Sequence, residues 1–174
     1  MTRTPARSAS ANEANIIVEH LQRYFVERLN GLSRAFGEAS DFAAFEWGRD
    51  EGRHGGGVRY VATDDALFNR GSVNVSQVHY DDDAGKKLGS ATALSTIIHP
   101  FNPLAPSIHM HISWTEMKSG KGYWRIMADL NPAIEEKAAT SAFTDCLKVA
   151  SGEYFEEGTA QGERYFNIPA LGRH

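Results

Sequence analysis

The stretch SIHMHISWTE, residues 107–116, decides the fold, because apolar and polar side chains alternate along it without a break. One set consists of Ile108, Met110, Ile112 and Trp114, and the other of Ser107, His109, His111, Ser113 and Thr115. Since successive side chains of a strand point to opposite faces, this period of two predicts a β-strand. One face is expected to pack on a hydrophobic layer, and the other carries imidazoles and hydroxyls.

Further strands are expected on both sides of this stretch. The pattern predicts them over residues 45–48, 58–63, 73–79, 91–99 and 123–130, separated by turn residues such as Gly55-Gly56-Gly57 and Asn102-Pro103. No helical pattern falls between the last strands, so the sheet is expected to be largely antiparallel. The glycine triplet is interpreted as a tight turn; the alternative is a set of backbone N–H groups that bind a carboxylate.

Two helices are expected to flank the sheet, which makes the fold class α+β. Residues 10–13 fit a capping box, and apolar residues then recur at helical spacing as far as Gly37. The side chains expected to pack on the sheet are Ile17, Leu21, Tyr24, Phe25, Val26, Leu29, Leu32 and Phe36. Asn131-Pro132 predicts the start of a second helix that runs to about residue 150. Residues 1–9 are expected to be a disordered lead-in and residues 10–174 a single domain.

Composition excludes several classes of protein. The 174 residues carry 18 Lys and Arg against 22 Asp and Glu, a net charge of −4, so a nucleic-acid partner is not expected. A single cysteine, Cys146, cannot form an internal disulfide, which favours a cytoplasmic protein. Apolar runs are too short for a transmembrane segment, and no secretory signal is recognisable at the start.

Polar side chains of three predicted strands are expected to share one face if consecutive strands are neighbours. They are Ser95, His99, His109, His111, Arg125 and Asp129. Three interpretations are open: a solvated surface, a metal site built on His-x-His with a third histidine, or a set of proton-transfer groups. The spacing of the histidines does not choose between the last two.

Three segments resemble motifs of the oxygen-dependent coproporphyrinogen III oxidases. GSVNVSQVH at 71–79 is similar to the Gly-Val-Asn-Phe-Ser-x-Val-His segment of that family. Residues 93–110 resemble its most distinctive block, Ser, three residues, His-Pro-x-Asn-Pro-x-x-Pro-Thr/Ser-x-His. Tyr123-Trp124 and the Asp-Leu-Asn-Pro of residues 129–132 look like its Trp-Trp and Asp-Leu-Thr-Pro. The resemblance runs from about residue 13 to 174.

The resemblance implies an antiparallel sheet flanked by helices, usually in a homodimer. It implies an oxidoreductase of haem and porphyrin biosynthesis that decarboxylates two propionates of coproporphyrinogen III to vinyl groups, giving protoporphyrinogen IX. Dioxygen is the co-substrate, and no organic or metal cofactor is required in many members, although a divalent metal such as manganese is described for others. The partners implied are therefore the tetrapyrrole, dioxygen and a second copy of the chain.

The resemblance also implies roles for individual residues. His109 is implied to be the catalytic proton-transfer group, and Ser95 a substrate contact. Substrate binding is also carried over to His111, Ile112 and Ser113, and Asp129 is expected to accept hydrogen bonds from pyrrole N–H groups. His99 and His109 are the metal ligands implied by metal-binding members.

Several positions depart from the family pattern. The family usually has Asn-Tyr-Arg where this chain has His111-Ile112-Ser113, so a substrate-binding arginine is missing. Residues 142–144 lack the family's His-x-His, and the sequence ends before an expected Arg-Gly-x-Gly-Gly, so the domain is expected to be C-terminally incomplete. Two alternatives to the enzyme are open: a catalytically degenerate homologue that binds a tetrapyrrole or polycarboxylate, and a metal-dependent oxygenase with histidine ligands.

Overall fold

A computed structural model of the chain describes residues 2–37, 41–63 and 66–165. Contacts divide the chain into two compact units, Met1–Ala133 and Ile134–His174. Each unit is described by itself. The last residues of the family resemblance, 166–174, lie outside the described part of the chain.

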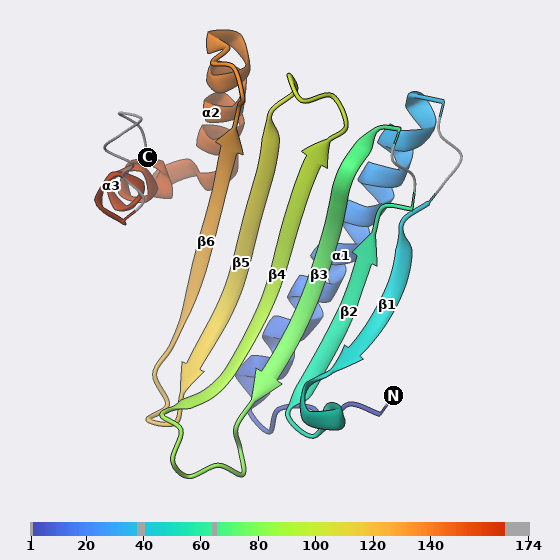
Figure 1. Cartoon of the computed structure of the whole chain (residues 1–174). Coiled ribbons are helices and arrows are strands. Elements are labelled where there is room, and N and C mark those ends of the chain that lie inside the picture. The colour runs from blue at the N-terminus through green and yellow to red at the C-terminus, as the bar shows by residue number, and fades with distance from the viewer. Residues whose placement is uncertain (1, 38–40, 64–65, 166–174) are drawn as a thin grey trace. The chain divides into compact units, whose positions relative to one another are not determined.

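The first unit is built on one antiparallel sheet whose strands follow one another in chain order (Figure 1). Its six strands are β1 Ala43–Gly48, β2 Gly55–Val61, β3 Phe68–His79, β4 Leu88–Pro100, β5 Ser107–Met117 and β6 Gly122–Asn131. The predicted α+β class and the antiparallel sheet are confirmed. The largest boundary difference is at β3, which begins five residues before the predicted start at residue 73.

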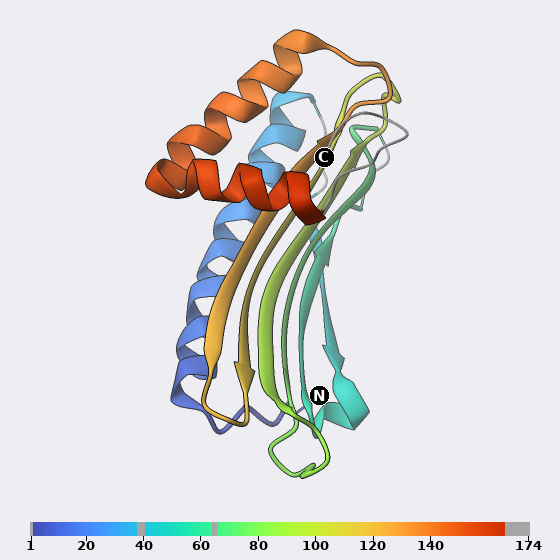
Figure 2. The ribbon, with the colours of Figure 1, turned by 90° about the vertical axis from the view of Figure 1, so that its left-hand side faces the viewer.

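Helix α1, Ala9–Ala35, covers one face of this sheet (Figures 1 and 2). The helix was predicted, and its packed face only in part: Val26 is buried and Leu21, Phe25 and Leu29 pack against the core, as expected. Ile17, Tyr24, Leu32 and Phe36 are instead exposed, Phe36 by 67%. The buried side chains are Ala11, Ala14, Val18, Gln22, Val26, Asn30 and Ser33. These recur every three or four residues and are mostly small, which lets the helix axis lie close to the sheet.

Polar members of this buried face bond to the backbone of other elements. The Gln22 Nε2 donates to Val58 O at 2.7 Å and to Val73 O at 3.0 Å, and the Asn30 Oδ1 accepts from Phe42 N at 2.9 Å. Buried amides of this kind are tolerated because their hydrogen bonds are satisfied. Hydrophobic periodicity alone therefore could not identify the whole packed face.

Residues 2–8, expected to be a disordered lead-in, are held by backbone hydrogen bonds. The N–H of Thr4 donates to Gly52 O at 2.9 Å, and the N–H of Ala6 donates to the Gln77 Oε1 at 3.0 Å. The α1 N-cap is Ser8, whose hydroxyl accepts from the Ala11 N–H, rather than the predicted Ser10. Amino-acid composition does not predict these hydrogen bonds, because their acceptors lie more than 40 residues away in the chain.

The hydrophobic core lies between α1 and the sheet. Its buried members are Val18, Val26, Phe42, Phe68, Val73, Val75 and Leu94. The rings of Phe42 and Phe68 meet edge to face, with centroids 5.5 Å apart. All of these strand residues point to the α1 face, which leaves the other face of the sheet for polar side chains.

The second unit contains α2, Lys137–Ser151, a short turn of 3-10 helix, Gly152–Tyr154, and α3, Phe155–Tyr165. The predicted helix exists but begins later, because Asn131 still pairs with Ser107 as the last residue of β6. No residue of α2 is buried, and Cys146 is exposed. Among the helices of the described residues, none combines the length and the apolar character that crossing a membrane requires.

An ion-pair network holds a tight turn at one end of the sheet. Asp50 and Glu51 both adopt left-handed backbone conformations, with φ of 48° and 58°. The His54 ring contacts the Asp50 Oδ2 at 2.6 Å through Nδ1 and the Asp82 Oδ1 at 2.9 Å through Nε2. Hydrogen bonds from Arg53 and then His54 lower the pKa of Asp82 to about 2, and bonds to Asp50 and then Asp82 raise the pKa of His54.

We expect His54→Ala to lower the melting temperature more at pH 5.5 than at pH 9. The raised pKa of His54 means that its contribution is fully present below 6.5 and is lost as the pH rises through the higher folded-state value. The depressed pKa of Asp82 means that its contribution is present above 3.8 and is lost as the pH falls towards about 2. Thermal denaturation of both proteins between pH 3 and 9 measures the effect.

His20→Ala is the control, because His20 lies exposed on α1 and outside this network. It is expected to change the melting temperature little at any pH. An equal loss for His54→Ala at pH 5.5 and pH 9 would contradict the ion-pair origin of the effect.

Candidate functional site

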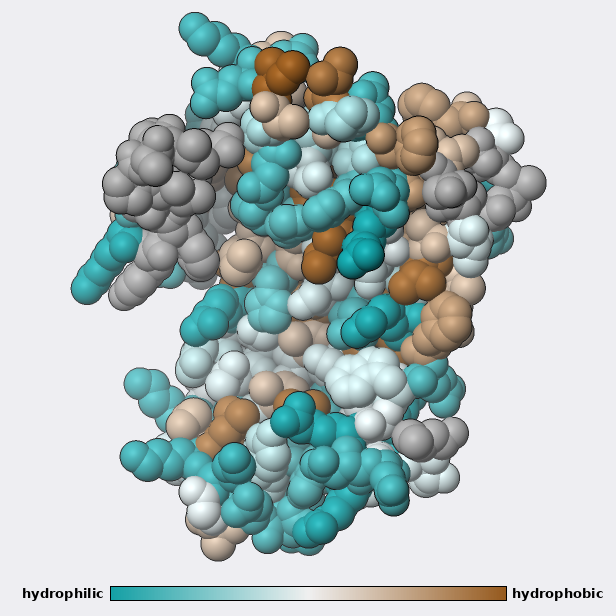
Figure 3. Space-filling view, in the orientation of Figure 1, coloured by the Kyte–Doolittle hydropathy of each residue, from teal (hydrophilic) through white to brown (hydrophobic). Residues whose placement is uncertain are grey.

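The six polar side chains predicted to share a face do so, on the side of the sheet opposite α1. Strand register places Ser95 opposite His111, His109 opposite Asp129, and Ser113 opposite Arg125. Residues directly opposite in an antiparallel pair point to the same face. Ser113 joins them through its pairing with Arg125, and we call the resulting seven residues the polar wall: Ser95, His99, His109, His111, Ser113, Arg125 and Asp129. Figure 3 shows this side of the molecule, where hydrophilic and hydrophobic side chains are interspersed.

Ser95 and His111 form one hydrogen-bonded pair of the polar wall. The Ser95 Oγ lies 2.8 Å from the His111 Nδ1. Burial, and then the positive charge of Arg125, lower the pKa of His111 below 6.5. The ring is therefore mostly neutral at pH 7, and its Nε2 is the donor or the acceptor according to the role that Nδ1 takes toward the serine.

His99 and His109 form a second pair, beside a carboxylate. Their Nε2 atoms are 2.9 Å apart and the two rings are stacked, with an interplanar angle of 26°. One nitrogen of such a pair must carry the proton and the other must accept it, so the two rings share a proton. On the opposite side of His109, Nδ1 lies 3.5 Å from the Asp129 Oδ2. The three side chains therefore lie in the order Asp129, His109, His99.

The two carboxylate oxygens of Asp129 differ in their hydrogen bonding. The Asn131 Nδ2 donates to Asp129 Oδ2 at 2.6 Å. Asp129 Oδ1 is buried and has no hydrogen-bond partner among the described residues. A buried carboxylate oxygen without a partner is energetically costly. The Asp129 side chain as a whole is 43% exposed, so its carboxylate is accessible from the polar wall.

Ile112 does not bring its side chain to the polar wall. It lies opposite Leu94 and packs against the hydrophobic core, on the α1 face of the sheet. Ser113 does lie on the wall, where it is 6% exposed. Ser113 supplies a hydroxyl group at the position where the family resemblance expects an arginine, so the polar wall has no positive charge at this position.

The glycine triplet belongs to β2 rather than to a turn. Gly55, Gly56 and Gly57 are buried and run between β1 and β3. A Cβ on Gly57 would lie 1.8 Å from Val75 O, and one on Gly56 would lie 2.2 Å from Trp47 O. The glycines are needed because backbones approach closely here, and this backbone lies inside the ladder rather than open to a carboxylate.

Further polar residues lie on this face, among them Arg70 and Asn74, which sequence reasoning missed. Arg70 is opposite His99, and Asn74 is opposite Ser95, with its Oδ1 accepting a hydrogen bond from Trp47 Nε1 at 3.0 Å. Arg70 fell outside the strand that was predicted to begin at residue 73. The Asn74 position was readable from the alternation of residues 73–79.

The donors present do not fit a divalent metal such as manganese. Manganese favours several oxygen ligands in an octahedral arrangement. His99 and His109 direct Nε2 atoms at each other, whereas Asp129 lies on the Nδ1 side of His109. Within the described ranges, no three His, Cys, Asp or Glu side chains are grouped as metal ligands.

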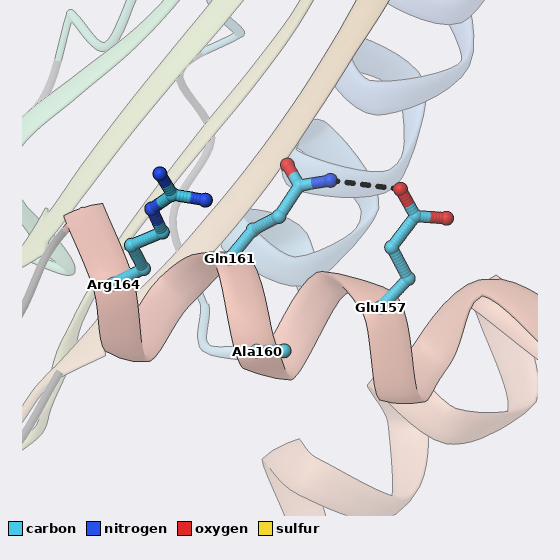
Figure 4. A pocket seen from close by; sticks show the side chains of 4 residues that line it. All are labelled: Glu157, Ala160, Gln161 and Arg164. Atoms are coloured by element: carbon cyan, nitrogen blue, oxygen red, sulfur yellow. Dashed lines mark hydrogen bonds between the residues drawn. The ribbon is translucent and has the colours of Figure 1, made fainter.

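A shallow hollow in the second unit contains none of the predicted site residues. It is lined by Glu157, Ala160, Gln161 and Arg164 of α3 (Figure 4). Gln161 Nε2 donates to Glu157 Oε1 at 3.0 Å across one turn of the helix. The described residues that line it all come from α3.

The fold and the polar wall together define a class of protein: an α+β domain whose antiparallel sheet presents paired histidines and a carboxylate on one face. The family model for coproporphyrinogen III oxidase matches residues 13–173. The chain therefore belongs to the coproporphyrinogen III oxidase family, and the resemblance found in its sequence is confirmed.

Relatives of the chain carry the same description. It is 32% identical over 157 residues to an oxygen-dependent coproporphyrinogen-III oxidase of Prochlorococcus marinus (strain NATL1A), an alignment covering 84% of this chain and 42% of the relative. It is 31% identical over 136 residues to the mitochondrial oxygen-dependent coproporphyrinogen-III oxidase of Homo sapiens, covering 66% of this chain and 30% of the relative. The chain thus spans well under half the length of these curated relatives.

Proposed function

We propose that this chain carries out the oxygen-dependent oxidative decarboxylation of coproporphyrinogen III to protoporphyrinogen IX. The observation that carries the proposal is the line Asp129, His109, His99 beside the Ser95–His111 pair on one face of the sheet. Family membership over residues 13–173 supports the choice of substrate.

The polar wall suits the proton movements of this reaction. Each propionate, –CH2–CH2–COOH, together with one dioxygen becomes –CH=CH2, carbon dioxide and hydrogen peroxide, so atoms balance with dioxygen as the only oxidant. Substrate replaces His99 at the His109 Nε2, and this nitrogen accepts the proton, while Asp129 on the Nδ1 side holds the ring in place. The partly exposed Asp129 carboxylate accepts a hydrogen bond from a pyrrole N–H, and the Ser95–His111 pair makes a further polar contact. No metal takes part in these steps.

A catalytically degenerate binding homologue is the second candidate. One observation favours it: Ser113 stands where the family resemblance expects a substrate-binding arginine. Losing a charge-assisted bond of that type costs about 1.5–3 kcal/mol of binding free energy. The third interpretation, a metal-dependent oxygenase, is disfavoured by the donor geometry described above.

The turnover experiment separates these candidates. Coproporphyrinogen III is prepared without oxygen, mixed with the protein, and exposed to air; products are then oxidised and separated by their number of carboxylates. We expect the two-carboxylate porphyrin to form, and a metal chelator to leave the rate unchanged. A protein-free sample controls for spontaneous oxidation, which keeps all four carboxylates.

Bound substrate without decarboxylation would refute the enzyme and support the binding homologue. A rate that the chelator abolishes and manganese restores would instead support the metal-dependent interpretation.

We further propose that the protein acts as a homodimer in the cytoplasm. Large apolar side chains that are exposed in the isolated chain support self-association, among them Ile126 at 73% and Phe36 at 67%. The single cysteine supports a reducing compartment.

A further inference from the structure

Arg125 projects from β6 onto the polar wall next to the Ser95–His111 pair. Its cross-strand partner is Ser113, and its diagonal neighbour on β5 is His111, which pairs with Met127. Diagonal neighbours in an antiparallel pair are about 7–8 Å apart at the backbone, within the reach of an arginine side chain. The guanidinium is close enough to His111 to oppose protonation of that ring.

The charge of Arg125 is not neutralised by the part of the chain that the structure describes. It forms no ion pair there, although Asp129 lies four residues along the same strand and on the same face. Four residues of strand span about 13 Å, which is too far for a salt bridge. Arg125 instead contacts the ring of Tyr123, with its Cζ 6.0 Å from the ring centroid. This cation–π contact restricts the movement of the exposed arginine side chain.

The other two arginines of this face stand elsewhere. Arg59 lies in the row of Asn74 and Ser95 but two strands away from Ser95, and Arg70 lies opposite His99. Two strands correspond to about 9–10 Å of sheet width. Arg125 is therefore the cation next to the buried Ser113, on the side of the wall away from β2 and β3.

We propose that Arg125 is the specificity-determining cation of the polar wall and holds one carboxylate of the substrate beside Ser95 and His111. The ligand group is a propionate-type carboxylate, which a planar guanidinium binds through two parallel hydrogen bonds. Arg125 on β6 supplies the positive charge that is missing at Ser113 on the neighbouring strand β5. This inference rests on the proposed function for the identity of the ligand.

Binding of coproporphyrin III, measured by quenching of tryptophan fluorescence, tests the inference. We expect Arg125→Gln to weaken binding about 10- to 100-fold, the size typical of a lost charge-assisted pair. Arg125→Lys is expected to recover part of the loss, because lysine keeps the charge but not the two-bond geometry. Coproporphyrin tetraamide, which has no carboxylates, is expected to bind wild type and Arg125→Gln equally.

Arg23→Gln is the matched control, since it removes the same charge from an exposed position on α1. It is expected to leave the affinity unchanged. Melting temperatures of all variants show that they are folded; Arg125 is exposed on an edge strand, so its loss is expected to leave the fold intact.

Three results would overturn the inference: wild-type affinity in Arg125→Gln, an equal loss in Arg23→Gln, or wild-type protein that does not bind coproporphyrin III. Failure of the proposed function looks different, because it leaves binding and its dependence on Arg125 in place while no decarboxylation occurs. In active protein, Arg125→Gln is expected to raise KM for coproporphyrinogen III by the same factor.

Discussion

His109→Ala is expected to lower the turnover of coproporphyrinogen III at least about 100-fold, the range typical of losing a general acid or base. His109 is the only member of the polar wall that contacts both a carboxylate, Asp129, and a second imidazole, His99, among the described residues. Its removal interrupts the path along which a proton moves. The rate is measured by separating two- and four-carboxylate porphyrins after reaction in air.

The fold is expected to survive this change. The side chain of His109 is 35% exposed and lies on the face opposite the hydrophobic core, so its truncation leaves no buried cavity. Ile97→Ala, at the cross-strand neighbour of His109, is the matched control and is expected to keep most of the rate. A His109→Ala variant with wild-type turnover would refute the proton-transfer role.

Gly57→Ala is expected to destabilise the first unit by at least about 3 kcal/mol, the upper range for overpacking in a dense interior. The added Cβ would lie 1.8 Å from Val75 O and 2.8 Å from the Val75 carbonyl carbon. Both atoms belong to the backbone of β3, so no side-chain rotation relieves the contact and the two strands must separate. Urea denaturation followed by circular dichroism measures the loss.

Gly31→Ala is the control for this second prediction. Gly31 lies inside α1, and a Cβ there meets nothing within 4 Å. Alanine is expected to raise the stability by roughly 0.5–1 kcal/mol, because glycine is a poor helix former. Wild-type stability in Gly57→Ala would show that β2 and β3 are not held as closely as the structure places them.

The strands and the polar face were predictable because both follow from local alternation. Residues 107–116 assign each side chain to a face by position alone, and β5 has those faces. The same alternation places the Ile112 side chain on the apolar face, where it packs against the hydrophobic core.

Local pattern revealed only part of the packed face of α1. Val26 and Leu29 lie in or against the core as predicted, whereas Ile17 and Phe36 are exposed and the small residues Ala11 and Ala14 are buried. Helix propensity and hydrophobic periodicity do not indicate how closely a helix packs against a sheet. A close approach favours small residues, and amides such as Gln22 are buried there because sheet carbonyls accept their hydrogen bonds.

By itself, the sequence determined the α+β class, the antiparallel strands and the family, since these depend on periodicity and on motifs contiguous in the chain. Only the tertiary structure decided which side chains meet. Strand register brings His99 to His109, His109 to Asp129, and Arg125 next to His111. A shift of one residue between strands would turn one side chain of each pair to the other face, so the site depends on the pairing of whole strands.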